Sequence, residues 1–91
     1  MTPLVTRQRL LEILGEDDEL VTLLIEHGII VETHGGFAPR QVERAIVSRT
    51  LLRELDVNAE GVEIIVRLRE RLLATHRQVA RLLEELRRQA H

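Results

Sequence analysis

The chain lacks cysteine altogether, and it has almost no aromatic side chains. The absence of cysteine excludes disulfides, thiolate metal sites and cysteine nucleophiles. Phe37 is the only aromatic residue, so the core must be aliphatic and rich in leucine, which favours the packing of helix on helix. The shortage of aromatic rings also removes the stacking platforms on which single-stranded nucleic acids are usually held.

No segment has the pattern of a targeting or membrane segment. The first residues, MTPLVTRQRLLEILGEDD, lack a basic start followed by a long apolar core, and no apolar run approaches the length needed to cross a bilayer. We therefore expect a cytoplasmic protein. A chain of 91 residues makes one small domain with a modest core, so pairing with a second copy is also expected.

Basic side chains are missing from one long stretch. Residues 10–36, LLEILGEDDELVTLLIEHGIIVETHGG, contain seven acidic residues and no basic residue, although the chain has 13 basic residues in all. A helix-turn-helix unit that reads DNA needs lysine or arginine to neutralise phosphates. This stretch is therefore expected to repel a duplex, and its simplest interpretation is a solvated face that aids solubility.

The same stretch carries the start and stop signals of two short helices. Thr6 is placed to cap a helix over about residues 7–14, which Gly15 ends. Asp17 is placed to cap a second helix, and Gly28 is a natural residue to follow its last turn. The pattern predicts two helices joined by a three-residue turn.

A wing and a third helix are predicted next. Residues 29–31 are β-branched, and the THGG turn before Phe37 favours a small two-stranded β-hairpin. Pro39 suits the first position of a helix over about residues 39–55. The stretch 56–58 breaks that helix.

From about residue 59 the chain reads as one long helix that runs to its end, without proline. This divides the chain into a domain over residues 1–58 and a terminal helix over residues 59–91. Apolar residues in the helix recur at alternating spacings of three and four, which is the heptad pattern of a coiled coil. The seam consists of Ile65, Leu68, Leu72, Val79, Leu82 and Leu86, with Thr75 as its one polar interruption.

Two interpretations of this seam are open. A regular apolar stripe can pack on the chain's own core. However, about 30 residues of helix span roughly 45 Å, which exceeds the width of the preceding small domain. We therefore predict a homodimer through this helix, with the two helices antiparallel.

Several local patterns resemble the MerR group of winged-helix proteins. EHGII at 26–30 resembles the end of that group's second helix, and FAPRQVERA at 37–45 resembles the start of its following helix. ELDVNAEGVEIIVRL at 54–68 is similar to the segment that begins its dimerisation region. Within the group the chain most resembles the chaperone-modulator family, CbpM. The resemblance implies a mostly α fold: a MerR-like winged helix-turn-helix with a small β-hairpin wing and a long C-terminal dimerisation helix.

The chain departs from the DNA-binding branch of this group at two places. Regulators of that branch place Arg-Tyr-Tyr in the second helix, where positions 22–24 here read Thr-Leu-Leu. Their wing carries Gly-Tyr-Arg, where positions 33–35 here read Thr-His-Gly. The second helix and the wing, which contact phosphate in that branch, therefore lack their basic residues here. This disfavours DNA as the ligand.

The resemblance to CbpM instead implies a protein partner. Members of that family bind the J-domain of a DnaJ/CbpA-type co-chaperone, which presents a positively charged helix to a DnaK-type chaperone. An acidic helix-turn-helix surface could cover that helix and so inhibit the action of the co-chaperone on its chaperone. The predicted partner-binding residues are Glu16, Asp17, Asp18, Glu19, Leu20, Leu24 and Glu26. Leu20, Leu24 and Ile25 are the candidate apolar anchors, although at least two of them must turn inward to build the core.

Two other functions remain open. Arg7, Arg9, Arg40 and Arg44 could form a backbone-binding patch, as in a dimeric MerR-family transcription regulator that binds DNA. The chain could also be an inert helical adaptor.

Enzyme chemistry is not predicted. No two of the four histidines form an i, i+3 or i, i+4 pair, so no metal site is expected. His27, just before Gly28, suits the end of a helix instead. The chain contains no phosphate loop and no nucleophile motif, and we expect neither catalytic residues nor a cofactor.

Overall fold

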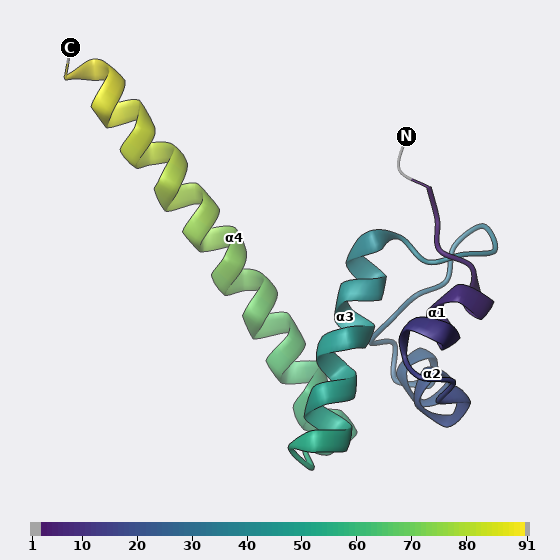
Figure 1. Ribbon diagram of the computed structural model, residues 1–91. Coiled ribbons are helices and arrows are strands. Elements are labelled where there is room, and N and C mark those ends of the chain that lie inside the picture. The colour runs from purple at the N-terminus through teal and green to yellow at the C-terminus, as the bar shows by residue number, and fades with distance from the viewer. Residues whose placement is uncertain (1–2, 91) are drawn as a thin grey trace.

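The computed structural model describes residues 3–90, which form a mostly helical structure with one helix that projects far beyond the rest (Figure 1). The elements follow in the order α1 (Arg7–Ile13), α2 (Asp18–Glu26), α3 (Pro39–Arg49), a π-helix η1 (Thr50–Glu54) and α4 (Ala59–Gln89). Residues 1–2, at the start of the predicted domain, and residue 91, at the end of the predicted terminal helix, lie outside the described residues.

The first two helices begin and end at the predicted residues. Thr6 Oγ1 accepts a hydrogen bond from the backbone N–H of Arg9 (3.1 Å), and Asp17 Oδ1 accepts one from that of Leu20 (3.0 Å). These side chains satisfy N–H groups that a helix start leaves without partners. Gly28 follows α2 with a φ of 67°, the left-handed conformation that glycine adopts without strain.

A two-stranded hairpin is not formed among the described residues. Ile29 and Ile30 are both buried, so consecutive side chains enter the core instead of alternating as they would in a strand. The backbone N–H of Val31 donates to Gln41 Oε1 (2.9 Å) and not to a second strand. Phe37 pairs with Val5 near the N-terminus, through backbone hydrogen bonds of 2.8 and 2.7 Å. The predicted wing is therefore a compact loop.

That loop closes in a tight turn over residues 33–36. The backbone N–H of Thr33 donates to the carbonyl of Gly36 (2.8 Å), and the N–H of Gly36 donates to that of Thr33 (3.0 Å). Gly36 lies against the N-terminal segment. A Cβ added there would meet Leu4 Cβ at 2.7 Å and the Val5 carbonyl oxygen at 2.9 Å, so this close approach of two segments requires glycine.

The third helix changes its winding near its end. Pro39 occupies its first turn as predicted, but the α-helix ends at Arg49 and the next five residues form the π-helix η1. The wider turn shifts the side chains that follow relative to an α-helical continuation. Leu51 and Leu52, within this segment, both pack against the core.

The core lies between α1, α2, α3 and the first turns of α4, and α3 contacts both α2 and α4. Its only aromatic residue, Phe37, is fully buried and contributes the largest side chain. The other buried apolar residues are Leu10, Leu14, Leu20, Val21, Leu24, Ile29, Ile30, Ala45, Val62 and Val66.

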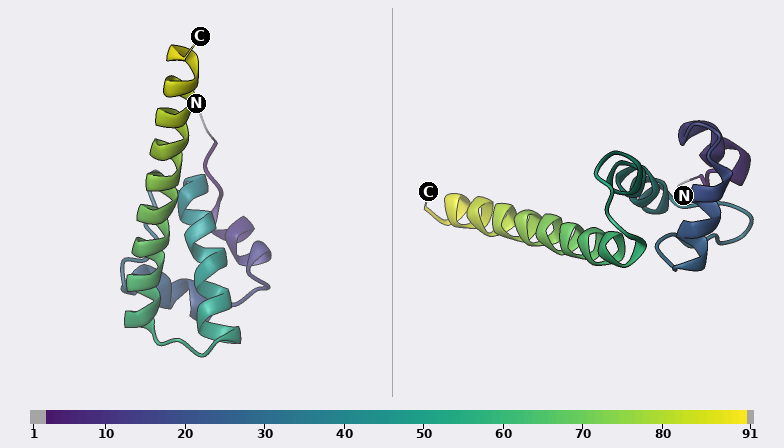
Figure 2. Two further views of the ribbon diagram at one scale, coloured as in Figure 1. Left: turned by 90° about the vertical axis from the view of Figure 1, so that its left-hand side faces the viewer. Right: turned by 90° about the horizontal axis from the view of Figure 1, so that it is seen from below.

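Helix α4 leaves this core after about three turns. Asn58 Oδ1 caps it by accepting from the backbone N–H of Gly61 (2.7 Å). Val62 and Val66 are its buried residues, whereas every residue from 71 to 90 is exposed. Figure 1 and the right view of Figure 2 show its C-terminal half pointing away from α1 and α2. The distal part of the stripe therefore does not pack on the chain's own core. Within residues 3–90 no helix is both long and apolar enough to cross a membrane.

Candidate functional site

The outer face of α2 carries most of the acidic side chains predicted to bind a partner. Asp18, Glu19, Thr22 and Glu26 follow one another at helical spacing, and the three carboxylates are exposed. Glu16, in the turn before α2, is also exposed. We call Glu16, Asp18, Glu19 and Glu26 the acidic face.

Two of the predicted apolar anchors are wrong. Leu20 and Leu24 are fully buried in the core, so neither can contact a partner. They occupy the side of α2 that faces α3. This agrees with the expectation that at least two of the three candidate anchors turn inward to build the core. Ile25 stays half-buried at one margin of the outer face, and Leu23 is half-buried at the other margin. Leu23 was missed because several adjacent leucines leave the phase of a short helix ambiguous.

Asp17 is also not a free partner-binding residue. Besides capping α2, its carboxylate accepts hydrogen bonds from Arg53 Nε (3.0 Å) and Nη2 (3.3 Å) in η1. The hydrogen bond from Arg53 is the main reason that the pKa of Asp17 lies below its usual value, and that of Arg53 is raised in return. Asp17 therefore holds α2 to η1.

The remaining acids differ in how far arginines neutralise them. Asp18 lies 3.8 Å from an Arg7 nitrogen, a loose pair with an exposed carboxylate. Among the described residues, Glu16, Glu19 and Glu26 form no ion pair. On the acidic face Glu16 and Glu26 thus keep unpaired charges, whereas Arg7 partly compensates Asp18 and Arg53 attracts Glu19 without forming an ion pair.

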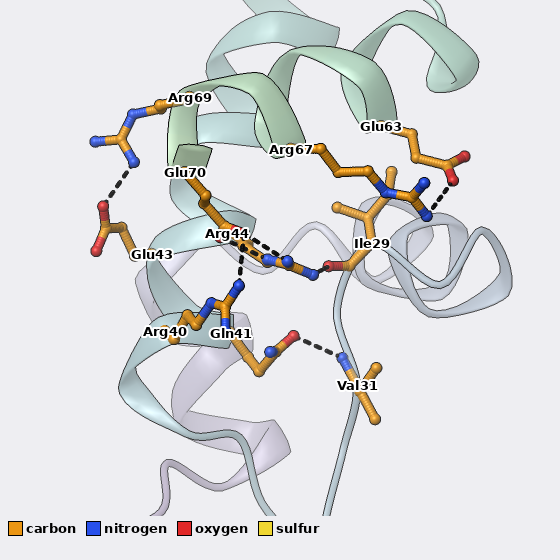
Figure 3. A network of polar contacts seen from close by, with 10 residues as sticks. All are labelled: Ile29, Val31, Arg40, Gln41, Glu43, Arg44, Glu63, Arg67, Arg69 and Glu70. Carbon is orange, nitrogen blue, oxygen red and sulfur yellow. Dashed lines mark hydrogen bonds and ion pairs between the residues drawn. The ribbon is translucent and has the colours of Figure 1, made fainter. Parts of the chain in front are cut away.

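The four arginines that could have bound a DNA backbone are all engaged within the chain. Arg7 pairs with Asp18, and Arg9 pairs with Glu12 at 2.9 Å. The other two lie on α3 and both bind one carboxylate of α4 (Figure 3). Each of the four therefore already has a carboxylate partner within the chain, although only Arg44 is largely shielded from solvent.

That shared carboxylate is Glu70. Arg44 Nε and Nη2 donate to its two oxygens at 2.7 and 2.6 Å, and Arg40 Nη2 donates at 2.9 Å. The hydrogen bonds from Arg44 and then from Arg40 lower the pKa of Glu70 to about 2. Arg44 also donates to the carbonyl of Ile29 (3.0 Å), so one guanidinium joins α3, α4 and the loop after α2.

The predicted dimerisation residues form a continuous exposed stripe on α4. Ile65, Leu68, Leu72, Val79, Leu82 and Leu86 are between 37% and 61% exposed. Thr75 interrupts the stripe, but its hydroxyl donates to the carbonyl of Arg71 (2.9 Å) and is satisfied within the helix. The whole seam is thus available to another molecule.

Metal-ligating side chains do not gather in the part of the chain that the structure describes: residues 3–90 contain no group of three or more histidine, aspartate or glutamate side chains that could hold a metal ion. His27 ends α2, as predicted. His91 lies outside the described residues.

Comparison with family models, with curated proteins and with solved structures gave no match to this chain.

Proposed function

We propose that this protein is a co-chaperone modulator, which binds the J-domain of a DnaJ/CbpA-type protein and inhibits its action on a DnaK-type chaperone. The observation that carries the proposal is the acidic face on α2, where Glu16, Glu19 and Glu26 are exposed and form no ion pair within residues 3–90, at the place where a DNA reader needs cations. It is supported by the resemblance of three sequence segments to the CbpM family. A basic helix of the J-domain is the ligand that this surface would recognise.

The mechanism is competitive masking. Opposite charges raise the rate of encounter and select the partner, whereas affinity depends on desolvated apolar contacts near the centre of an interface. Leu23 and Ile25, half-buried at the two margins of the outer face of α2, are the apolar side chains nearest the acids and the ones on which this proposal relies. A J-domain helix held there is no longer free to meet its chaperone.

The fold proposed for this role is the MerR-like winged helix-turn-helix. The order of α1, α2, a loop with a tight turn, α3 and a long terminal helix supports it. In this proposal the compact turn over residues 33–36 stands at the place of the wing.

The protein acts as a homodimer through α4 in this proposal. The exposed seam and the absence of intramolecular cover beyond residue 71 support a second copy as its occupant. The C-terminal half of α4 points away from α1 and α2 (Figure 2), so a second copy on that part of the seam would lie away from the acidic face.

Charge reversal on the acidic face tests the function. The variant combines Asp18→Lys, Glu19→Lys and Glu26→Lys, and it keeps Asp17 because that residue caps α2 and binds Arg53. A matched control carries the same change of charge at three exposed acids elsewhere, as Glu54→Lys, Glu60→Lys and Glu84→Lys.

Calorimetric titration with an isolated J-domain is the measurement. We expect at least about a tenfold loss of affinity for the acidic-face variant and a much smaller loss for the control. Circular dichroism checks that both keep their helix content. Equal binding by the two variants would remove the acidic face from the mechanism.

An electrophoretic shift with random duplex DNA at low salt tests transcription regulation. Because Arg7, Arg9, Arg40 and Arg44 each have a carboxylate partner within the chain, we expect at most weak retention. Tight, salt-sensitive retention would instead favour a DNA-binding regulator.

A further inference from the structure

We propose that two copies of α4 pair in one particular antiparallel register, in which Arg71 of each protomer forms an ion pair with Glu85 of the partner subunit. The register is centred on position 77. The inference rests on the proposed homodimer and adds to it the residues that select how the copies align.

The seam faces away from the domain to which α4 belongs. At about 100° per residue, the seam positions lie roughly 100–180° around the helix axis from Val66. Val66 and Val62 are the α4 residues buried in the domain's own core. A second copy can therefore lie along the seam without displacing that core.

The direction of α4 is fixed before the free part of the seam begins. Glu70 is bound by Arg44 and Arg40 from α3, and Arg69 Nη1 donates to Glu43 Oε1 at 2.7 Å (Figure 3). These contacts join two faces of α4 to α3. The exposed helix after residue 70 is thus presented in one orientation.

Helix periodicity limits the antiparallel arrangements to two that bury six seam positions per chain. In antiparallel pairs, the first apolar position of a heptad in one helix faces the second apolar position in the other. One register, centred on position 77, pairs Leu68 with Leu86, Leu72 with Leu82 and Thr75 with Val79. The other, shifted by one heptad, pairs Ile65 with Leu82, Leu68 with Val79 and Leu72 with Thr75.

Charges beside the seam distinguish the two registers. Arg71, Gln78 and Glu85 occupy equivalent flanking positions one heptad apart, and flanking positions of this kind face one another in antiparallel pairs. The register centred on position 77 brings Arg71 opposite Glu85 twice and Gln78 opposite its own copy. The shifted register brings Arg71 opposite Gln78 and Glu85 opposite Ile64, which forms no pair of opposite charges.

Arg71 and Glu85 are available for this role. Both side chains belong to exposed residues, and neither forms an ion pair within residues 3–90. Other arginines of α4, such as Arg67 and Arg69, are already paired with Glu63 and Glu43.

A parallel pair fits less well. It would bring Arg71 beside His76 of the partner subunit and Thr75 opposite Thr75 of the partner subunit. In the antiparallel register, Thr75 packs against Val79 of the partner subunit. Its hydroxyl needs no further partner because it already donates to the Arg71 carbonyl.

Cysteine cross-linking tests the register cleanly, because the chain has no cysteine of its own. Two full-length variants, Thr75→Cys and Val79→Cys, are reduced, mixed to exchange chains and then oxidised. We expect disulfide-linked heterodimers in the mixture and little cross-linking in either variant alone.

The other outcomes each overturn the proposal. Cross-linking of Thr75→Cys with itself would indicate a parallel pair, and cross-linking of Thr75→Cys with Leu72→Cys would indicate the shifted register. A protein that light scattering shows to be dimeric but that gives no cross-link at any pair would exclude this alignment while retaining the homodimer. A monomer would exclude the homodimer itself, independently of the J-domain titration.

Charge exchange tests the ion pair. Arg71→Glu and Glu85→Arg should each raise the dimer dissociation constant by about threefold to tenfold, and the double variant should restore it. The matched controls Arg77→Glu and Glu84→Arg lie on the side of α4 away from the seam and should change it little. Failure of the double variant to recover would show that Arg71 and Glu85 do not meet.

Discussion

Glu70 on α4 and Arg44 on α3 form a two-point ion pair, with both guanidinium contacts at 2.7 Å or less. Their side chains are only about one-fifth exposed, so solvent screens this pair less than the surface pairs elsewhere. The pair lies where α4 leaves the domain. It therefore determines the direction of the exposed half of the helix.

Removal of the Glu70 charge should destabilise the protein measurably. Glu70→Gln keeps the shape of the side chain but leaves Arg44 and Arg40 without their counter-charge, at a cost on the order of 2 kcal/mol. Urea unfolding followed by circular dichroism measures the change. Glu63→Gln is the control, because Glu63 pairs only with Arg67 on the same helix, and it should cost less than about 0.5 kcal/mol.

The same residue predicts how stability depends on pH. The pKa of Glu70 is lowered from 4.5 to about 2 by Arg44 and Arg40. The stabilisation from a lowered pKa is complete above the unfolded value and is lost as the pH falls through the folded value. The stability difference between wild type and Glu70→Gln should therefore be constant above about pH 5 and shrink between about pH 4.5 and 2. A difference that is unchanged at pH 2.5 would contradict this assignment.

Asp17 should contribute to stability in two separable ways. Asp17→Ala removes both the cap of α2 and the pair with Arg53, and should cost about 1–2 kcal/mol. Asp17→Asn keeps a capping oxygen, so it should cost less. Arg53→Ala removes only the exposed pair and should cost less than about 1 kcal/mol. Additive effects of Asp17→Ala and Arg53→Ala in a double-mutant cycle would show that the two side chains do not interact.

Gly36→Ala should destabilise the N-terminal segment by about 1–3 kcal/mol, because the new methyl group would meet Leu4 Cβ and the Val5 carbonyl. Thermal unfolding measures the loss. Gly35→Ala offers a contrast: its Cβ would meet nothing within 4 Å, so its cost would come from its φ of 78° alone. Hydrogen exchange at Val5 and Phe37 should accelerate in Gly36→Ala and change little in Gly35→Ala.

The seam on α4 should be required for self-association. Leu72→Asp places a charge in the proposed dimer interface and should convert the dimer to a monomer at micromolar concentration. Arg77→Asp, on the side of α4 away from the seam, should leave the mass unchanged. Sedimentation equilibrium distinguishes the two results, and an unchanged mass for Leu72→Asp would show that the seam is misplaced.

The helices and their ends could be predicted because their signals are local. Thr6, Asp17, Gly28 and Pro39 each act on backbone groups within four residues, so the sequence contains all the information needed. The π-helix at Thr50–Glu54 is different. No local pattern in the sequence marks it, although Leu51 and Leu52 within it pack against the core.

The charge of the candidate site could be predicted from the sequence, but its ion pairs and the burial of its leucines could not. The acidic composition before residue 36 is a property of the sequence, whereas the neutralisation of Asp17 by Arg53 joins residues 36 positions apart. Whether Leu20 and Leu24 are buried depends on how a nine-residue helix is rotated about its axis. Leu23 is equally apolar, so the sequence alone does not determine which leucines face the core. Contacts of this kind become visible only when the helices are packed.

The length of the exposed half of α4 sets the distance between the two domains of the proposed dimer. Because every residue from 71 to 90 is exposed, removal of one complete heptad from the distal part of α4 should preserve the phase of the seam and the fold of the domain. It would bring the two acidic faces closer by about 10 Å along the helix axis. The distance between the two acidic faces of the proposed dimer is thus set by the length of α4, and it would change in steps of seven residues.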